Sequence, residues 1–242
     1  MTPHGGSSRE LERTIESVDA VARRMGPDES LQHIVVVNNG SGIPEEVRTR
    51  TATFRYLDIN PASSRSLARN TALEHGSESE AVLFLDSGDE LLEGVLPAMR
   101  MLPAGGLVHG RTEIRSVGKR FRRRNWGAGL SRYVNPFYLG SVVCDVGLLG
   151  GLEFEEGRKE DWKFWLQVLE REPEVVRSDE IVYAYHVKSA ADHVRRKTRI
   201  LPAQIRFFRE YLGLGPLHTV FALTIHLVLN GLHWLAFGWR KR

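Results

Sequence analysis

Apolar residues recur along the chain with two spacings, one typical of helices and the other of short buried strands. Ser7 and Glu10 have the spacing of a capping box that begins a helix. The apolar residues that follow at helical intervals are Leu11, Ile15, Val18, Ala22 and Met25. They predict a helix from about Arg9 to Met25. The β-branched run His33 to Val37 then predicts a strand, which ends in a loop rich in turn residues.

The stretch Ala81 to Glu90, AVLFLDSGDE, predicts a buried central strand that stops at two acids. Carboxylates at the C-terminal end of such a strand lie over the crevice where open α/β sheets bind ligands. Hard oxygen ligands suit Mg²⁺ or Mn²⁺, so Asp86 and Asp89 are candidate metal ligands. The alternative is a polar turn that caps the next helix, because Ser87, Gly88 and Asp89 all favour turns.

The remaining pattern predicts a mixed α/β chain. One helix is expected from near Ser64 to His75, and another from Leu91 to Arg100. Strands are predicted at Thr53 to Leu57, Gly105 to Gly110, Thr112 to Val117 and Ile181 to His186. The short strands after residue 105, linked by turns, indicate a change from alternating units to a smaller mixed-sheet region.

Composition places the chain among ordinary globular proteins. Its 242 residues suffice for one sizeable core, and 42% hydrophobic with 26% charged residues argues against wholesale disorder. The formal charge of +3 indicates no strongly basic or acidic partner. The single cysteine, Cys144, fits a reducing compartment, and its apolar neighbours predict a buried side chain. No signal-peptide pattern is visible at the N-terminus.

The densest basic cluster is Lys119 to Arg124, KRFRRR, followed by Trp126. Basic residues interleaved with aromatic ones bind nucleic acid in some proteins, and anionic lipid or an acidic glycan in others. The commonest explanation is a solvated loop between strands. We favour an acceptor-facing or membrane-facing role over nucleic acid, because the rest of the chain has no recognisable nucleic-acid module.

The tail from Leu217 to Gly238 carries no formal charge and is long enough, at roughly 33 Å as a helix, to cross a bilayer. Its weakly polar residues share one sector of a helical wheel: His218, Thr219, His226, Asn230 and His233. This pattern favours a helix in the membrane interface, with Arg240, Lys241 and Arg242 on anionic lipid. A helix packed on a membrane partner and a helix of a soluble core are the alternatives.

Several motifs together resemble one protein family. The segment Ser64 to Glu90 is similar to the family 2 glycosyltransferases, whose usual run is a small-residue turn, ARN, a helix, and a strand ending in LDxDD. This resemblance implies an α/β GT-A-like (Rossmann-like) fold, a mixed sheet flanked by helices. It implies donor binding by Asp86 and by Arg65 and Arg69, which fall four apart on one helix face. Gly88 stands where the family has its second acid.

The first helix and strand also resemble this family. RTIESV looks like its first helix, and IVVVNNGSG like the strand and loop that usually end in DDGS. Asn38 and Asn39 replace the acids that contact the nucleotide in relatives, and they keep hydrogen-bonding capacity without the charge. The family's opening strand is represented by four residues, Met1 to His4. We expect these to be the tail of a strand that begins further upstream.

The second region of resemblance is Asn135 to Cys144 together with LGGLEFEEGRKEDWKFWLQVL. Glu160, Asp161 and Trp162 match the family's ED and the aromatic residue that follows, which implies that Asp161 is the catalytic base. Glu160 and Trp162 are then candidates for acceptor binding. Gln167 replaces an arginine that relatives often carry. His186 matches a place where metal-dependent relatives supply a histidine to the metal, although a histidine at a strand end is more often a polar terminator.

Together these features predict a glycosyltransferase domain over residues 1–190, followed by a basic helical segment and a membrane-associating helix over residues 191–242. The resemblance implies an inverting transfer from a nucleotide-sugar donor, with Mg²⁺ or Mn²⁺. The apolar tail points to a cell-envelope or lipid-linked glycan as the acceptor, so we expect a role in polysaccharide biosynthesis at the cytoplasmic face of the cell membrane. A non-catalytic relative with a degraded donor site is the rival hypothesis, and a nucleic-acid binder is a weaker one.

Overall fold

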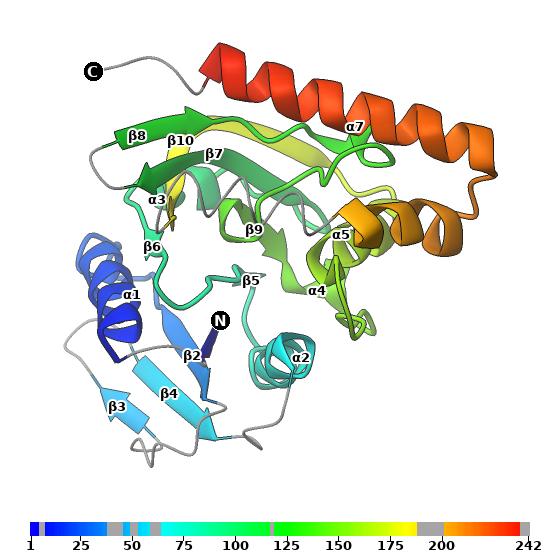
Figure 1. Ribbon diagram of the computed structural model, residues 1–242. Helices are drawn as coiled ribbons and strands as arrows, with labels where there is room; N and C mark the ends of the chain where they lie inside the picture. Colours follow the sequence, from blue (N-terminus) through cyan, green and yellow to red (C-terminus); the bar gives the residue numbers. More distant parts are fainter. Residues whose placement is uncertain are drawn as a thin grey trace.

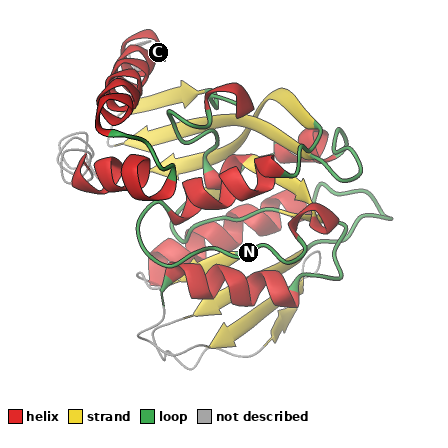
Figure 2. Cartoon of the chain, turned by 90° about the vertical axis from the view of Figure 1, so that its right-hand side faces the viewer, coloured by secondary structure: helices red, strands yellow, loops and turns green. Residues whose placement is uncertain are grey.

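The computed structural model describes residues 1–4, 8–37, 46–48, 53–58, 64–116, 119–187 and 201–237 of the chain (Figure 1). Its strands form two sheets, which Figure 2 shows as two groups of yellow arrows with helices between and around them. The predicted α/β class is confirmed. Asn38, Asn39 and the basic residues at 240–242 lie outside the described residues.

The first sheet has the strand order β1, β2, β4, β3. Parallel pairs join β1 (Thr2–His4), β2 (Gln32–Val37) and β4 (Thr53–Asp58), and β3 (Glu46–Arg48) is antiparallel to β4. Because successive side chains of a strand point to opposite faces, β2 supports a helix on each side. Val35 packs on Leu11 of α1 (Ser8–Ala22), whereas Ile34 and Val36 pack on α2 (Arg65–His75).

The apolar run that begins at Ala81 connects the two sheets. Its first two residues form β5 (Ala81–Val82), which pairs with β9 (Val142–Asp145) of the second sheet. The next residues turn to the first sheet, where the Met1 amino group donates to the Leu83 carbonyl at 2.9 Å and the Leu85 N–H donates to the Met1 carbonyl at 2.8 Å. The expected single central strand is therefore divided between two neighbours, and Asp86 emerges at the junction of the sheets.

The second sheet has the order β5, β9, β7, β10, β6, with β8 also paired to β7. The expectation of two short strands around Gly110 was wrong, because β7 (Leu107–Ser116) runs through that glycine. A Cβ atom there would lie 2.5 Å from Val182 of β10 (Val175–His186), so glycine permits close packing and does not form a turn. The basic cluster was expected in a loop, but it forms the strand β8 (Lys119–Arg123).

Several helices differ in length from the prediction. The helix expected from Leu91 to Arg100 is reduced to α3 (Val95–Met99), because Leu91 belongs to β6 (Glu90–Leu91) and pairs with β10. The other helical elements are α4 (Val146–Leu149), α5 (Glu160–Glu170), the 3-10 turns η1 (Ala128–Leu130) and η2 (Leu139–Ser141), residues 201–206 with the π-helical η3 (Phe207–Tyr211), and α7 (Pro216–Phe237). Cys144 is 1% exposed within β9, as its apolar neighbours predicted.

Part of the weakly polar side of helix α7 contacts the body of the protein, whereas His218 is exposed. Thr219 is 5% exposed, and the His226 ring stacks on Trp162 of α5 with 5.8 Å between ring centroids while its Nδ1 lies 2.9 Å from the Tyr133 carbonyl oxygen. The outer side carries large apolar residues, with Leu217 86% and Val220 63% exposed. Within the described ranges, no helix combines the length and apolar character that crossing a membrane requires.

Candidate active site

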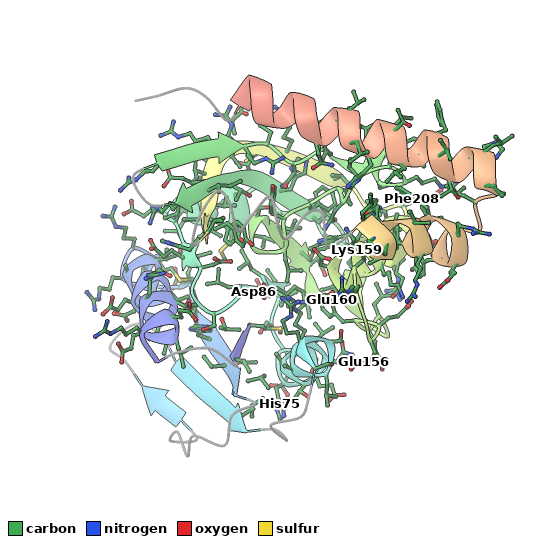
Figure 3. All side chains as sticks on the ribbon, in the orientation of Figure 1. His75, Asp86, Glu156, Lys159, Glu160 and Phe208 are labelled. Atoms are coloured by element: carbon green, nitrogen blue, oxygen red, sulfur yellow. The ribbon has the colours of Figure 1, made fainter. Side chains whose placement is uncertain are left out.

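Acidic side chains from distant parts of the chain meet at Arg69, on α2. The helix begins at Ser64, whose side chain accepts a hydrogen bond from the Leu67 N–H, and this cap fixes the face on which Arg69 lies. The Arg69 guanidinium is 2% exposed, and it donates to Asp86 at 2.8 Å and to Glu160 at 3.3 Å. Figure 3 shows Asp86 and Glu160 side by side between the two sheets.

The charge of Arg69 is fixed by these contacts. Burial alone lowers the pKa of its guanidinium, but the carboxylates of Asp86, Glu160 and Asp161 outweigh burial and raise that pKa overall. A buried cation with carboxylate partners stays ionised and holds them in place. Arg69 therefore organises the acids and has almost no surface open to a ligand. Arg65, one turn earlier, has a side chain that is 57% exposed and lies 3.5 Å from Glu160.

Asp161 occupies the first turn of α5, next to Glu160. Its Oδ2 accepts a hydrogen bond of 2.7 Å from the side-chain amide of Asn135. Burial raises the pKa of this carboxyl and the negative charge of Glu160 raises it further, while Arg69 and Lys159 oppose the shift. A carboxylate with a raised pKa is a stronger base, and the contact with Asn135 holds it in one orientation.

Asp89 lies within hydrogen-bonding distance of groups on β10. It is 4% exposed, its Oδ2 accepts from the Tyr183 hydroxyl at 2.9 Å, and its Oδ1 accepts from the His186 N–H at 3.0 Å. Burial, the largest cause, raises the pKa of Asp89 to about 8. The His186 ring lies 2.7 Å from Glu90, which also pairs with Arg115. Of the three residues predicted as metal ligands, Asp89 and His186 are thus occupied by structural contacts.

The donor set fits a divalent cation at Asp86 alone. Mg²⁺ usually binds one or two carboxylates and completes its coordination with substrate phosphates and water. The Asp86 side chain is 34% exposed, so an oxygen can reach a cation there. Asp89 does not fit, because it is 4% exposed and both of its carboxylate oxygens accept hydrogen bonds from β10. The described residues contain no group of three or more His, Cys, Asp or Glu side chains placed to hold a metal.

Trp162, predicted to contact an acceptor, is fully buried. Its exposed fraction is 0%, and its indole N–H donates to the Ser131 carbonyl at 2.6 Å. The ring packs against Phe207, Phe208 and His226, so it offers no surface to a ligand in this structure.

Two residues near Asp161 were not singled out from the sequence. Asn135 was noted only as the start of a region, and its amide is now the hydrogen-bond partner of Asp161. Lys159 lies with its ammonium 5.6 Å from the centre of the Trp162 ring, and burial lowers the pKa of that ammonium. The position of Lys159 beside the ED pair could have indicated it, whereas nothing local marked Asn135, which is 26 residues from Asp161.

Solved structures share this arrangement of elements. The mannosyltransferase PcManGT from Pyrobaculum calidifontis, in complex with GDP-Man and Mn²⁺, superposes with a TM-score of 0.62 over 94% of this chain and 72% of its own, at 17% identity. S. aureus TarS 1-349 in complex with UDP gives 0.59 over 94% and 69%, at 16% identity, and its complex with UDP-GlcNAc gives 0.57 over 93% and 70%, at 15% identity. The chain has a glycosyltransferase fold. No protein-family model and no curated protein matches the sequence.

These comparisons confirm the predicted fold class and leave the individual site residues as predictions. The similar structures bind nucleotide sugars or a nucleotide, and one contains Mn²⁺. At 15–17% identity the likeness concerns the path of the chain. The chemical roles of the acids in this chain therefore depend on the contacts around Arg69 and Asp161.

Proposed function

We propose that the chain is an inverting glycosyltransferase of the family 2 type, which moves a sugar from a nucleotide-sugar donor to a hydroxyl group of a glycan. One observation carries this proposal. Asp86 and Glu160 bind the same buried guanidinium group of Arg69. Asp161 follows Glu160 in the chain and accepts a hydrogen bond from Asn135. These contacts bring together the partly exposed carboxylate of Asp86 and the carboxylate of Asp161, whose pKa is raised, in a glycosyltransferase fold.

The transfer is a single displacement. Asp161 takes the proton from the acceptor hydroxyl, whose oxygen forms a bond to the anomeric carbon while the bond from that carbon to the donor's phosphate oxygen breaks. The electron pair of the broken bond leaves with the nucleoside diphosphate. A divalent cation held by Asp86 supplies positive charge to that diphosphate when bound. Arg65 is the exposed cation of the site, and Asn38 and Asn39 are proposed to contact the nucleotide.

We further propose that residues 1–190 carry catalysis and that residues 191–242 attach the protein to the cytoplasmic face of the cell membrane. The outward apolar residues of α7 support this assignment. The acceptor is then a cell-envelope or lipid-linked glycan in polysaccharide biosynthesis. A non-catalytic glycan-binding protein is the second candidate, and the buried state of Asp89 and Trp162 favours it.

Substitution of Asp161 by asparagine tests the proposal. The change keeps the side-chain shape and removes the base, so release of nucleoside diphosphate from a panel of UDP-sugars and GDP-sugars with Mn²⁺ should fall about 10²- to 10⁴-fold. Donor binding, measured by calorimetry, should stay within about twofold. Asp179→Asn, on a 71% exposed acid that pairs with Arg111, is the matched control. Full turnover in Asp161→Asn, or no donor binding by the unsubstituted protein, would contradict the proposal.

A further inference from the structure

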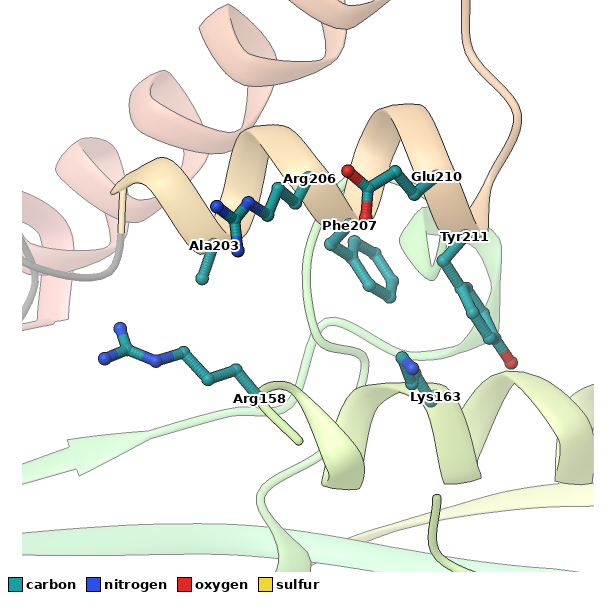
Figure 4. A pocket seen from close by; sticks show the side chains of 7 residues that line it. All are labelled: Arg158, Lys163, Ala203, Arg206, Phe207, Glu210 and Tyr211. Atoms are coloured by element: carbon teal, nitrogen blue, oxygen red, sulfur yellow. The ribbon is translucent and has the colours of Figure 1, made fainter. Parts of the chain in front are cut away.

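A cavity of about 390 Å³ opens between α5 and the helical segment 201–211. Its walls belong to two elements that are distant in sequence. Arg158 lies in the loop before α5, and Lys163 lies in α5 itself. The opposite helix contributes Arg206, Phe207 and Tyr211 (Figure 4). None of these residues takes part in the contacts around Arg69.

Positive charge dominates the lining of this cavity. The lining contains three basic side chains, Arg158, Lys163 and Arg206, and one carboxylate, that of Glu210. Lys163 is partly neutralised, because its ammonium lies 2.7 Å from Glu155. Arg206 has no ion-pair partner among the residues that the structure describes. Figure 4 shows the two arginine side chains extending toward the same open side from opposite walls.

Two guanidinium groups on facing walls match a phosphate group. Each planar guanidinium group donates paired hydrogen bonds to phosphate oxygens. Two guanidinium groups balance the two negative charges of a phosphate dianion, whereas a single carboxylate carries only one negative charge. The rest of the lining is Tyr211, Phe207 and Ala203, which offers ring and methyl surface to the carbon skeleton attached to a phosphate. The cavity volume suits a sugar phosphate or a similar small ester, and is larger than phosphate alone requires.

We propose that this cavity is a binding site for a phosphate ester, and that it holds a phosphate of the acceptor. The second part rests on the proposed function. Arg158 precedes Asp161 by three residues, so their Cα atoms are at most about 11 Å apart. An acceptor with its phosphate between the arginines therefore has to extend from the cavity wall to the first turn of α5 to bring a hydroxyl group to the Asp161 carboxylate. The phosphate belongs either to the glycan itself or to a lipid carrier.

Arginine substitutions in the full chain test the site. The double variant Arg158→Gln/Arg206→Gln should bind inorganic phosphate and glycerol 3-phosphate at least tenfold more weakly than the unsubstituted protein, measured by ³¹P NMR titration with UDP present to occupy the donor site. Arg209→Gln, on an exposed arginine of the same helix outside the cavity, should bind as the unsubstituted protein does. The single variant Arg206→Gln should show an intermediate loss. Equal phosphate affinity in all four proteins would overturn the proposal.

Lipid and soluble esters distinguish the two sources of phosphate. If flotation with phosphatidic acid vesicles depends on Arg158 and Arg206 more strongly than binding of glycerol 3-phosphate does, the site takes a lipid phosphate. If both assays depend equally on the two arginines, the site takes a phosphate of the glycan. If neither assay depends on them, the cavity is not a phosphate site. Donor turnover is measured separately. Phosphate binding without turnover keeps the site and rejects the transferase, whereas turnover with phosphate affinity insensitive to both arginines rejects the site alone.

Discussion

Asp86 and Asp89 show how differently two neighbouring acids can be used. Both follow the same apolar run, and both were predicted to bind a metal. Asp86 keeps a 34% exposed side chain and pairs with Arg69, whereas Asp89 is 4% exposed and bonded to β10. A turn separates the two acids, in which Gly88 has a positive φ and the Asp89 N–H donates to the Asp86 carbonyl at 3.0 Å. Metal binding is therefore expected at the first acid, and the second one stabilises the fold.

The raised pKa of Asp89 predicts a pH-dependent stability. Its carboxyl has a pKa of about 8 in the folded protein against an ordinary value of 3.8, so between these pH values the folded state binds the additional proton. The free energy of unfolding should then decrease as pH rises from 4 to 8, with a contribution from this group of up to about 1.4 kcal/mol per pH unit.

Urea unfolding between pH 5 and pH 8 measures this contribution as the difference between the unsubstituted protein and Asp89→Asn. Asparagine keeps an acceptor for the His186 N–H and cannot ionise, so the variant should show a flatter decline. Asp179→Asn, which removes an exposed acid, should leave the slope almost unchanged. Parallel curves for the unsubstituted protein and Asp89→Asn would show that burial does not raise the pKa of Asp89.

At the scale of elements, β7 and β10 illustrate a packing constraint that a local pattern does not reveal. Gly110 lies within β7 where β10 approaches most closely, and an added Cβ would meet Val182 at 2.5 Å and the Glu180 carbonyl at 3.0 Å. Gly110→Ala should therefore destabilise the protein by about 1–3 kcal/mol through overpacking. Gly129→Ala, at a glycine with no atom within 4 Å, should change stability by about 0.5 kcal/mol or less. Chemical denaturation of both variants checks the pair, and similar losses would refute this account.

The sequence predicted those elements whose signals are local. Residues of α1 and α2 carry caps or apolar stripes within one segment, and these helices form close to where they were expected. Contacts between distant residues decided the rest. Gly110 was interpreted as part of a turn because the local sequence does not show that β10 packs against it. The orientation of Asp89 depends on Tyr183, which is 94 residues away. The contacts of Asp86 and Glu160 with Arg69 were not predicted, because the family resemblance assigned these residues only to donor and acceptor binding.

At the scale of the whole molecule, the C-terminal part of α7 lies beside the basic strand β8 (Figure 1). The exposed apolar residues of the helix are Leu217, Val220, Phe221, Leu227 and Val228, and exposed Arg120 and Arg122 come from the strand. Exposed apolar residues on the helix and exposed arginines on the strand together fit the surface of an anionic bilayer, where the apolar groups enter the interface and the arginines meet head groups.

Vesicle flotation tests this orientation. The variant Leu217→Gln/Val220→Gln/Phe221→Gln should bind vesicles of phosphatidylglycerol and phosphatidylcholine at least tenfold more weakly than the unsubstituted protein, because each side chain contributes about 1.5–3 kcal/mol when fully buried. Leu67→Gln/Met101→Gln removes two apolar residues elsewhere that are each 46% exposed, and it should leave binding unchanged. If the control loses as much binding as the α7 variant, the helix is not the attachment surface.

The stack of His226 on Trp162 affects how the tail can be studied. Trp162 adjoins Asp161 in the chain, and its ring is covered by side chains from α7 and η3. A protein shortened before Pro216 would uncover this indole and loosen the first turn of α5, so its lost turnover would not separate anchoring from damage at the base. Truncation is therefore an ambiguous experiment here, and substitutions confined to the outer side of the helix are the informative ones.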